Sequence, residues 1–141
     1  MNETLTQQLQ PTAPPHTCNR SPRVEKSDKR KPIGRTVREL DRIFHQLPDA
    51  SFCFDIGHAR QMDSTMTEAY FFLRRFSGCL QQVHLSEVNT RSKHDHLSYA
   101  SILAFREVAS LIPEYVPSIL ETPVPEDQIE FEMSQALKPC R

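Results

Sequence analysis

Short apolar runs alternate with amphipathic segments along most of this chain, and this alternation constrains the fold more than any other feature. We predict a β-strand at each apolar run, near 51–55, 80–85 and 116–121. We predict a helix at each segment with apolar residues at helical spacing, near 36–47, 65–77, 99–112 and 126–137. Strands that alternate with helices form right-handed parallel crossover units. The expected fold is therefore α/β, with parallel strands alternating with helices that pack outside the sheet.

Local signals mark the ends of these helices. Thr36 and Glu39 form a capping-box pattern, Pro48 ends the first helix, Gly78 follows the second and Ser98 caps the third. The expected apolar stripes are Val37, Leu40, Phe44 and Leu47, then Ala69, Phe72, Leu73 and Phe76, then Ile102, Phe105, Val108, Ala109 and Ile112, and finally Ile129, Met133 and Leu137. We expect each stripe to face the sheet.

The first 32 residues differ from the rest in composition. They contain Pro11, Pro14, Pro15, Pro22 and Pro32, and their few apolar residues have no regular spacing. This profile predicts a disordered arm over 1–32 and one folded domain over 33–141. The arm carries a basic run over 29–31, which suits either an acidic partner or, more simply, a solvated tail.

Composition also limits the class of protein. Charged residues make up 25% of the chain and the net charge is −1, so no overall field attracts nucleic acid or an anionic membrane. No apolar run approaches the roughly 20 residues of a membrane span. Cys18, Cys53, Cys79 and Cys140 show no CxxC spacing, and no secretory signal is recognised ahead of them. We expect reduced thiols, a cytoplasmic location, and neither a membrane nor a nucleic acid as partner.

Chain length limits the architecture. A complete (β/α)8 barrel takes roughly 250 residues, and this chain has 141. Three strands are also too few to close a barrel. The chain is therefore either a small open sheet or the C-terminal half of a barrel.

A polar residue stands at the carboxyl end of each predicted strand: Asp55, His84 and Glu121. Parallel α/β folds build their sites at this edge. Two carboxylates and an imidazole suit Mn²⁺, Mg²⁺ or Zn²⁺. Each residue also has a structural explanation, because Asp55 suits a cap, His84 a hydrogen-bonded core position and Glu121 a solvated loop. Their shared position on successive strands favours one divalent-metal site.

The same segments carry a resemblance to a known family. "FCFDIGHA", "QQVHLSE" and "SILETP" resemble three successive strand-end motifs of the xylose isomerase-like TIM barrel superfamily. That superfamily contains sugar and sugar phosphate isomerases and epimerases, and abasic-site nucleases of the endonuclease IV type. The resemblance runs from about residue 33 to 137 and implies the C-terminal half of a TIM barrel.

The resemblance implies a role for each matching residue. Asp55, His84 and Glu121 would bind the metal, and Glu121 would also act as a catalytic carboxylate. His58 would contact the substrate, a sugar or sugar phosphate, or bind a neighbouring ion. Gly57 would give the chain room to turn between Asp55 and His58.

Two departures from the family pattern stand out. The first four strands are absent, and with them the other catalytic glutamate, although Glu25 lies at a suitable distance before Asp55. The loop that contains His94, Asp95 and His96 lacks the glycines of many isomerases, and His94 stands where the nuclease has an aspartate. This loop is equally well explained as an exposed polar segment.

Three classes of function therefore remain open. The first is an isomerase- or epimerase-like protein, and the second is a metal-dependent abasic-site nuclease. The third is a non-catalytic truncated barrel, which would self-associate or need a partner that supplies the missing half. Visible ligands for one metal and the near-neutral charge favour the first class.

Overall fold

The computed structural model describes residues 23–25 and 33–136. The helices are α1 (Val37–Gln46), α2 (Ile56–Met62), α3 (Thr67–Phe76), α4 (Tyr99–Ala109) and α5 (Ile129–Ala136). The strands are β1 (Arg23–Glu25), β2 (Ser51–Asp55), β3 (Leu80–Leu85), β4 (Glu87–Val88), β5 (His94–Asp95) and β6 (Ser118–Leu120). Two short 3-10 helices are η1 (Ser77–Cys79) and η2 (Glu126–Gln128).

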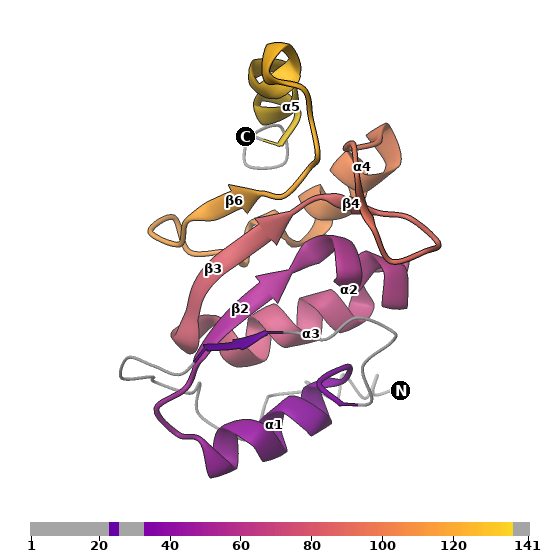
Figure 1. The fold of residues 1–141 in the computed structure, drawn as a ribbon. Helices are drawn as coiled ribbons and strands as arrows, with labels where there is room; N and C mark the ends of the chain where they lie inside the picture. The colour runs from indigo at the N-terminus through magenta and orange to yellow at the C-terminus, as the bar shows by residue number, and fades with distance from the viewer. Residues whose placement is uncertain (1–22, 26–32, 137–141) are drawn as a thin grey trace, which may run out of the picture.

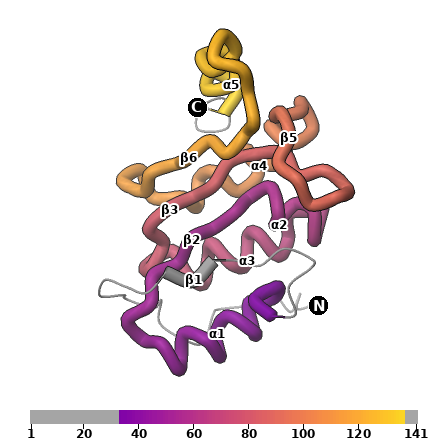
Figure 2. The backbone as a smooth tube through the Cα atoms, in the orientation of Figure 1, coloured from indigo at the N-terminus to yellow at the C-terminus, as the bar shows by residue number. Residues whose placement is uncertain are grey.

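Four strands form one sheet in the order β1-β2-β3-β6, and all of the pairs are parallel (Figure 1). The prediction of an α/β fold with parallel strands is therefore confirmed. A separate antiparallel pair, β4 and β5, lies in contact with α2 and follows β3 in the chain (Figure 2).

One hydrophobic core holds helices α1, α3 and α4 against the sheet. Phe52 and Phe54 of β2 are fully buried and contact a group of aromatic rings that includes Phe44 of α1 and Phe72 and Phe76 of α3. Alternate residues of a strand point to opposite faces. Phe52 and Phe54 thus mark the helix-covered face, and the residues between and after them lie on the other face.

The helix caps explain where the first and third long helices begin. Thr36 accepts a hydrogen bond from the backbone N–H of Glu39 at 3.3 Å, and the Glu39 side chain caps the Thr36 backbone in return. Hydrogen bonds from the Arg35 and Thr36 backbone hold the pKa of Glu39 below its ordinary value. Ser98 caps α4 by accepting the N–H of Ser101 at 3.1 Å. Both caps were readable from the sequence.

The structure departs from the predicted elements at several places. The predicted disordered arm lies mostly outside the described residues, but 23–25 within it form β1, which pairs with β2. Helix α2 and the β4–β5 pair were not expected. The last helix begins at Ile129 after a 3-10 turn rather than at 126.

Two predicted core stripes are incomplete. Leu40 and Phe44 are buried as expected, whereas Leu47 is 42% exposed because it lies beyond the last residue of α1. Ile129 and Met133 of α5 are exposed rather than packed against the sheet, and Leu137 lies outside the described residues.

Two further expectations concern the membrane and the cysteines. Among the described helices, none has the length and apolar character to cross a bilayer. Cys53 and Cys79 are buried and form no disulfide, and Cys18 and Cys140 lie outside the described residues.

Candidate metal centre

Strand register brings the three predicted ligands to one edge of the sheet. Asp55 of β2 pairs directly with His84 of β3. On the other side of β3, His84 pairs with Ile119 and the N–H of Glu121 donates to the carbonyl of Leu85 at 3.0 Å. The three polar residues therefore follow from parallel pairing at the carboxyl ends of neighbouring strands.

The side chains of Asp55, His84 and Glu121 converge. Each offers one ligand atom, and these atoms all lie within 4.8 Å of one another. His84 Nδ1 lies 2.9 Å from Glu121 Oε1, yet it has no partner aligned as a hydrogen bond among the described residues. A close nitrogen and carboxylate oxygen without hydrogen-bond alignment is the arrangement expected of two ligands that face the same cation.

Asp55 has a second role at the start of α2. Its Oδ1 accepts the backbone N–H of His58 at 2.8 Å and so caps the helix. The residue is only 1% exposed, and burial of a carboxylate is costly unless hydrogen bonds or cations compensate. The cap satisfies one oxygen, and the carboxylate has a second oxygen for an ion.

His84 is held from the side opposite the carboxylates. Its Nε2 contacts the Gln82 amide and lies 3.4 Å from Cys53 Sγ. Both neighbours are buried, and both lie on the sheet face that Asp55 shares. A metal-binding histidine commonly donates its second ring N–H to an acceptor. The Cys53 sulfur can accept it here, whereas the contact of Gln82 is through its amide nitrogen, which is a donor. Gln82 and Cys53 thus orient the ring so that Nδ1 faces Glu121.

A second group of candidate ligands shares Asp55. Asp55, His58 and His94 also place one ligand atom each within 4.8 Å of one another. The His58 and His94 rings meet edge to face with centroids 5.4 Å apart. His58 is 7% exposed, and its Nδ1 has no hydrogen-bond partner among the described residues. His94 Nε2 lies 3.8 Å from Glu121 Oε2, so the two groups adjoin.

Contacts of the β4–β5 pair hold His94 close to Asp55 and His58. Ser86, which is fully buried, places its Oγ 2.7 Å from His94 Nδ1. Glu87 of β4 pairs with Arg60 of α2 and accepts a hydrogen bond from the Ser98 hydroxyl at 2.5 Å. These bonds tie the pair to α2, which carries His58, and to the residue that caps α4.

Gly57 allows α2 to lie close to the strand that follows β3. It lies within α2, so the expectation that it frees a loop to turn is wrong. A Cβ at this position would lie 2.5 Å from the carbonyl oxygen of Ser86 and 2.8 Å from Val88 Cγ2. The absence of a side chain therefore sets the distance between His58 and the β3–β4 segment.

Two other polar residues of the sequence analysis lie apart from these groups. His96 Nδ1 lies 3.5 Å from Glu132 Oε2 on α5, and Asp95 accepts the N–H of His96 at 2.9 Å. Glu25 is the last residue of β1, where it pairs with Cys53, two residues before Asp55. Its backbone thus stands near the same edge of the sheet.

Sequence reasoning did not find Ser86, Gln82 or Cys53 as parts of the site. Gln82 and Cys53 each lie two residues before a predicted ligand in a strand. The two-residue period of a strand puts them on the same face, and this signal was available. Ser86 had no such signal, because its contact depends on a chain reversal that the sequence analysis did not predict.

The donor set fits a divalent cation of borderline character. Carboxylate oxygens and neutral imidazole nitrogens suit Mn²⁺ and Zn²⁺, and carboxylates also suit Mg²⁺. His58 Nδ1 and His84 Nδ1 belong to these groups, and neither has an aligned hydrogen-bond partner among the described residues, which supports a fit to metal rather than to a closed hydrogen-bond network.

The comparisons with known proteins add no assignment. No family model matches the chain, and no curated protein matches it.

Proposed function

We propose that this chain is a metal-dependent, sugar isomerase- or epimerase-like protein whose sheet is the C-terminal half of a (β/α)8 barrel. The observation that carries the proposal is the convergence of Asp55, His84 and Glu121 at the carboxyl ends of parallel strands. Sites in barrel enzymes are built at this edge. The resemblance of the three strand-end motifs to the xylose isomerase-like superfamily supplies the reaction class.

A bound divalent ion would act as a Lewis acid that stabilises negative charge on a substrate oxygen. The reaction then needs a carboxylate that removes a proton beside a carbonyl and returns it to the same or the adjacent carbon. Glu121 is the candidate for this step, because its side chain is 30% exposed and so remains open to a substrate. His58 belongs to the adjoining group with Asp55 and His94 and is the candidate for contact with a sugar hydroxyl.

A second carboxylate is required where protons move between two carbons. Glu25 is the candidate by position, since it ends β1 beside β2. In this proposal the small molecule is a sugar or sugar phosphate, and the ion is Mn²⁺, Mg²⁺ or Zn²⁺.

The test is hydrogen exchange rather than net conversion, because exchange reports proton abstraction even when equilibrium favours the substrate. The full chain with Mn²⁺ is incubated in D₂O with a panel of aldoses, ketoses and their phosphates, and deuterium at the carbons beside the carbonyl is followed by NMR. Exchange by the wild type that Glu121→Gln abolishes supports the proposal. Metal binding without exchange across the panel would leave the non-catalytic truncated barrel as the better description.

The second ligand group favours one alternative, a metal-dependent abasic-site nuclease. Such enzymes use adjoining metal ions to cleave a phosphodiester, and Asp55, His58 and His94 form a group next to the first. Two equivalents of bound Zn²⁺, together with cleavage of abasic-site DNA that His94→Ala removes, would favour the nuclease. One equivalent and no cleavage would favour the isomerase.

A further inference from the structure

Both outer strands of the sheet have an open edge within the described chain. β6 pairs only with β3, and β1 pairs only with β2. An open edge presents unpaired backbone N–H and C=O groups to any strand that can align with it. The two edges lie at opposite ends of one parallel sheet, so each could accept the other from a second molecule.

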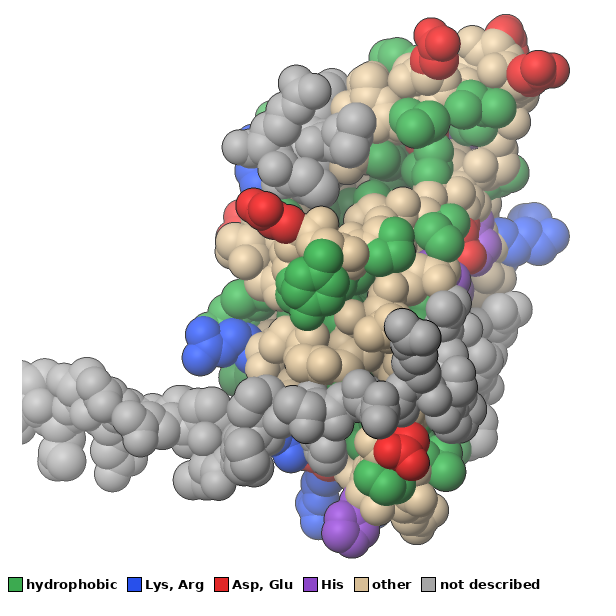
Figure 3. Space-filling model, turned by 90° about the vertical axis from the view of Figure 1, so that its left-hand side faces the viewer, with side chains coloured by type: hydrophobic (Ala, Val, Ile, Leu, Met, Phe, Trp, Pro, Cys, Tyr) green, Lys and Arg blue, Asp and Glu red, His purple; other side chains and the backbone are tan. Residues whose placement is uncertain are grey.

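An apolar groove follows the β6 edge. It has a volume of about 600 Å³ and runs between β6 and α5. Ile119 of β6 is 42% exposed, and Ile129 and Met133 of α5, which line the same groove, are 39% and 50% exposed. Figure 3 shows hydrophobic side chains on the upper part of one face of the molecule, below acidic side chains at the top. Exposed apolar surface of this kind marks an interaction site.

Exposed side chains of opposite charge lie near the two ends of the molecule, although α1 also carries Glu39, which is hydrogen-bonded, and Asp41, which is ion-paired. Glu126 and Asp127 of η2 and Glu130 at the start of α5 are exposed, and none has an ion-pair partner among the described residues. At the other end, Arg38 and Arg42 are exposed on α1 and are likewise unpaired within the described chain.

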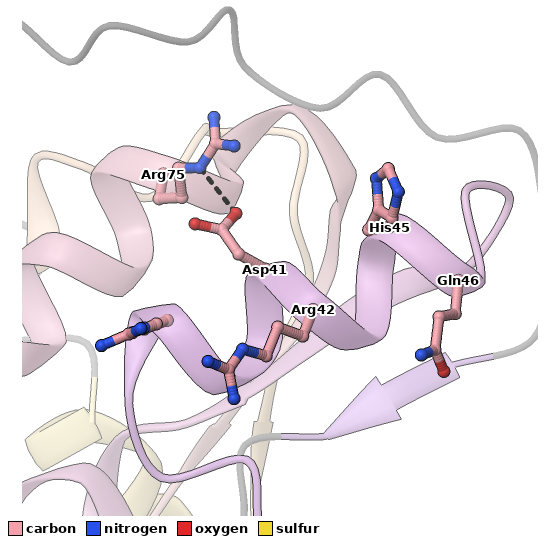
Figure 4. A pocket seen from close by; sticks show the side chains of 6 residues that line it. Asp41, Arg42, His45, Gln46 and Arg75 are labelled. Atoms are coloured by element: carbon pink, nitrogen blue, oxygen red, sulfur yellow. Dashed lines mark hydrogen bonds and ion pairs between the residues drawn. The ribbon is translucent and has the colours of Figure 1, made fainter.

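The two arginines of α1 lie together in a shallow groove. Arg38 and Arg42 line it together with His45 and the Arg75–Asp41 ion pair of 2.8 Å (Figure 4). Figure 1 shows α1 and α5 at opposite ends of the row of elements. Arg38 and Arg42 of α1 therefore lie at the β1 end of the sheet, and the acidic start of α5 lies at the β6 end.

We propose that two copies of this chain form a closed pair, in which β1 of each copy runs parallel along β6 of the other and Arg38 and Arg42 of α1 lie beside the acidic start of α5. A twofold axis along the strands keeps every strand parallel and makes both contacts at once, which closes the assembly. Four strands from each copy give eight, the number at which parallel strands close into a barrel filled by side chains.

A second copy suits these surfaces better than an unrelated partner, because one chain carries both complementary halves. The β1 end supplies an open edge, basic charge and Ile33, which is 58% exposed just before α1. The β6 end supplies an open edge, acidic charge and the apolar groove. Closure covers both at once. The inference does not depend on metal binding or catalysis.

Charge reversal tests this pairing. One variant carries Arg38→Glu with Arg42→Glu, and another carries Glu126→Lys with Glu130→Lys. Each alone brings like charges together at both contacts, and we expect at least ~10-fold weaker dimerisation in sedimentation equilibrium. A one-to-one mixture of the two variants matches opposite charges at both contacts, and we expect a heterodimer of near wild-type affinity.

The control reverses exposed charges away from both ends. Glu107→Lys with Glu114→Lys alters α4 and the turn after it, and it should leave dimerisation unchanged. Far-UV circular dichroism of each variant verifies its fold. A wild type that stays monomeric, an open series of larger species, or mixed variants that form no heterodimer would overturn the proposal.

Discussion

The Gly57→Ala substitution tests the packing of α2 beside the site, because two physical effects predict opposite signs. In a helix, alanine is more favourable than glycine by about 1 kcal/mol, so local propensity alone predicts a more stable protein. The structure predicts the reverse. A Cβ at Gly57 would lie 2.5 Å from the Ser86 carbonyl oxygen, 2.8 Å from Val88 Cγ2 and 3.1 Å from Ser86 Oγ.

The size of the destabilisation depends on which atoms the new Cβ would contact. Overpacking a tight site costs about 1–3 kcal/mol, and the nearest atom here belongs to the backbone, which cannot rotate away. The cost therefore lies near the upper value. After the gain in propensity of about 1 kcal/mol, we expect a net loss of about 2 kcal/mol. For a domain of this size that lowers Tm by about 10 °C.

The assay is thermal and urea unfolding of the wild type and the variant, followed by circular dichroism. Gly78→Ala is the matched control, since Gly78 is exposed in η1 with an ordinary φ, and it should be neutral or slightly stabilising. A Gly57→Ala protein as stable as the wild type, or more stable, would refute the close approach of α2 to the β3–β4 segment.

Two further predictions concern polar side chains near the ends of helices. Thr36→Ala should lower the free energy of unfolding, measured by urea denaturation, by about 1 kcal/mol, because the hydroxyl that accepts the Glu39 N–H is lost. Thr36→Ser keeps a hydroxyl and should retain most of the stability, and equal losses in both variants would contradict the cap. Hydrogen bonds from the Thr65 hydroxyl and the Glu68 N–H hold the pKa of Asp63 below its ordinary value of 3.8. The stability that these hydrogen bonds give the ionised Asp63 is present above pH 3.8 and is lost as the pH falls through the lowered pKa. Asp63→Asn should therefore destabilise the protein near neutral pH and differ less from the wild type in acid. A difference in stability that stays constant with pH would contradict this role of Asp63.

The central part of the fold was readable from the sequence because its signals are local and agree with one another. The capping box at Thr36, the fully apolar run at 52–54 and the stripe through Phe72 and Phe76 each specify one element and its buried face. Helix α2 was missed because Gly57 signals a turn as strongly as a close approach. β1 was missed because its strand is three residues long and lies among prolines.

The candidate site was readable in part, for a similar reason. Asp55, His84 and Glu121 follow from strand order alone, since parallel strands bring their carboxyl ends to one edge. The approach of His94 depends on the β4–β5 pair and on its contact with Ser86. Such a long-range reversal has no local pattern in this stretch, so the second ligand group could not be predicted.

Asp55 both caps α2 and belongs to the candidate metal site, and one substitution can remove the second role while keeping the first. Asp55→Ser keeps a side-chain oxygen that can cap α2 but removes the carboxylate. Any loss of metal binding by this variant then reports on the ligand rather than on the helix.

The most direct test of the site is calorimetric titration of Mn²⁺ into the full chain and four variants. These are Asp55→Ser, His84→Ala, Glu121→Gln and, as a control on an exposed carboxylate elsewhere, Glu114→Gln. Even changes around a metal's ligands commonly cost about 10–100-fold in affinity, so we expect at least this loss in each of the first three variants and none in the control. Equal affinity in the wild type and all four variants would contradict a metal site formed by Asp55, His84 and Glu121.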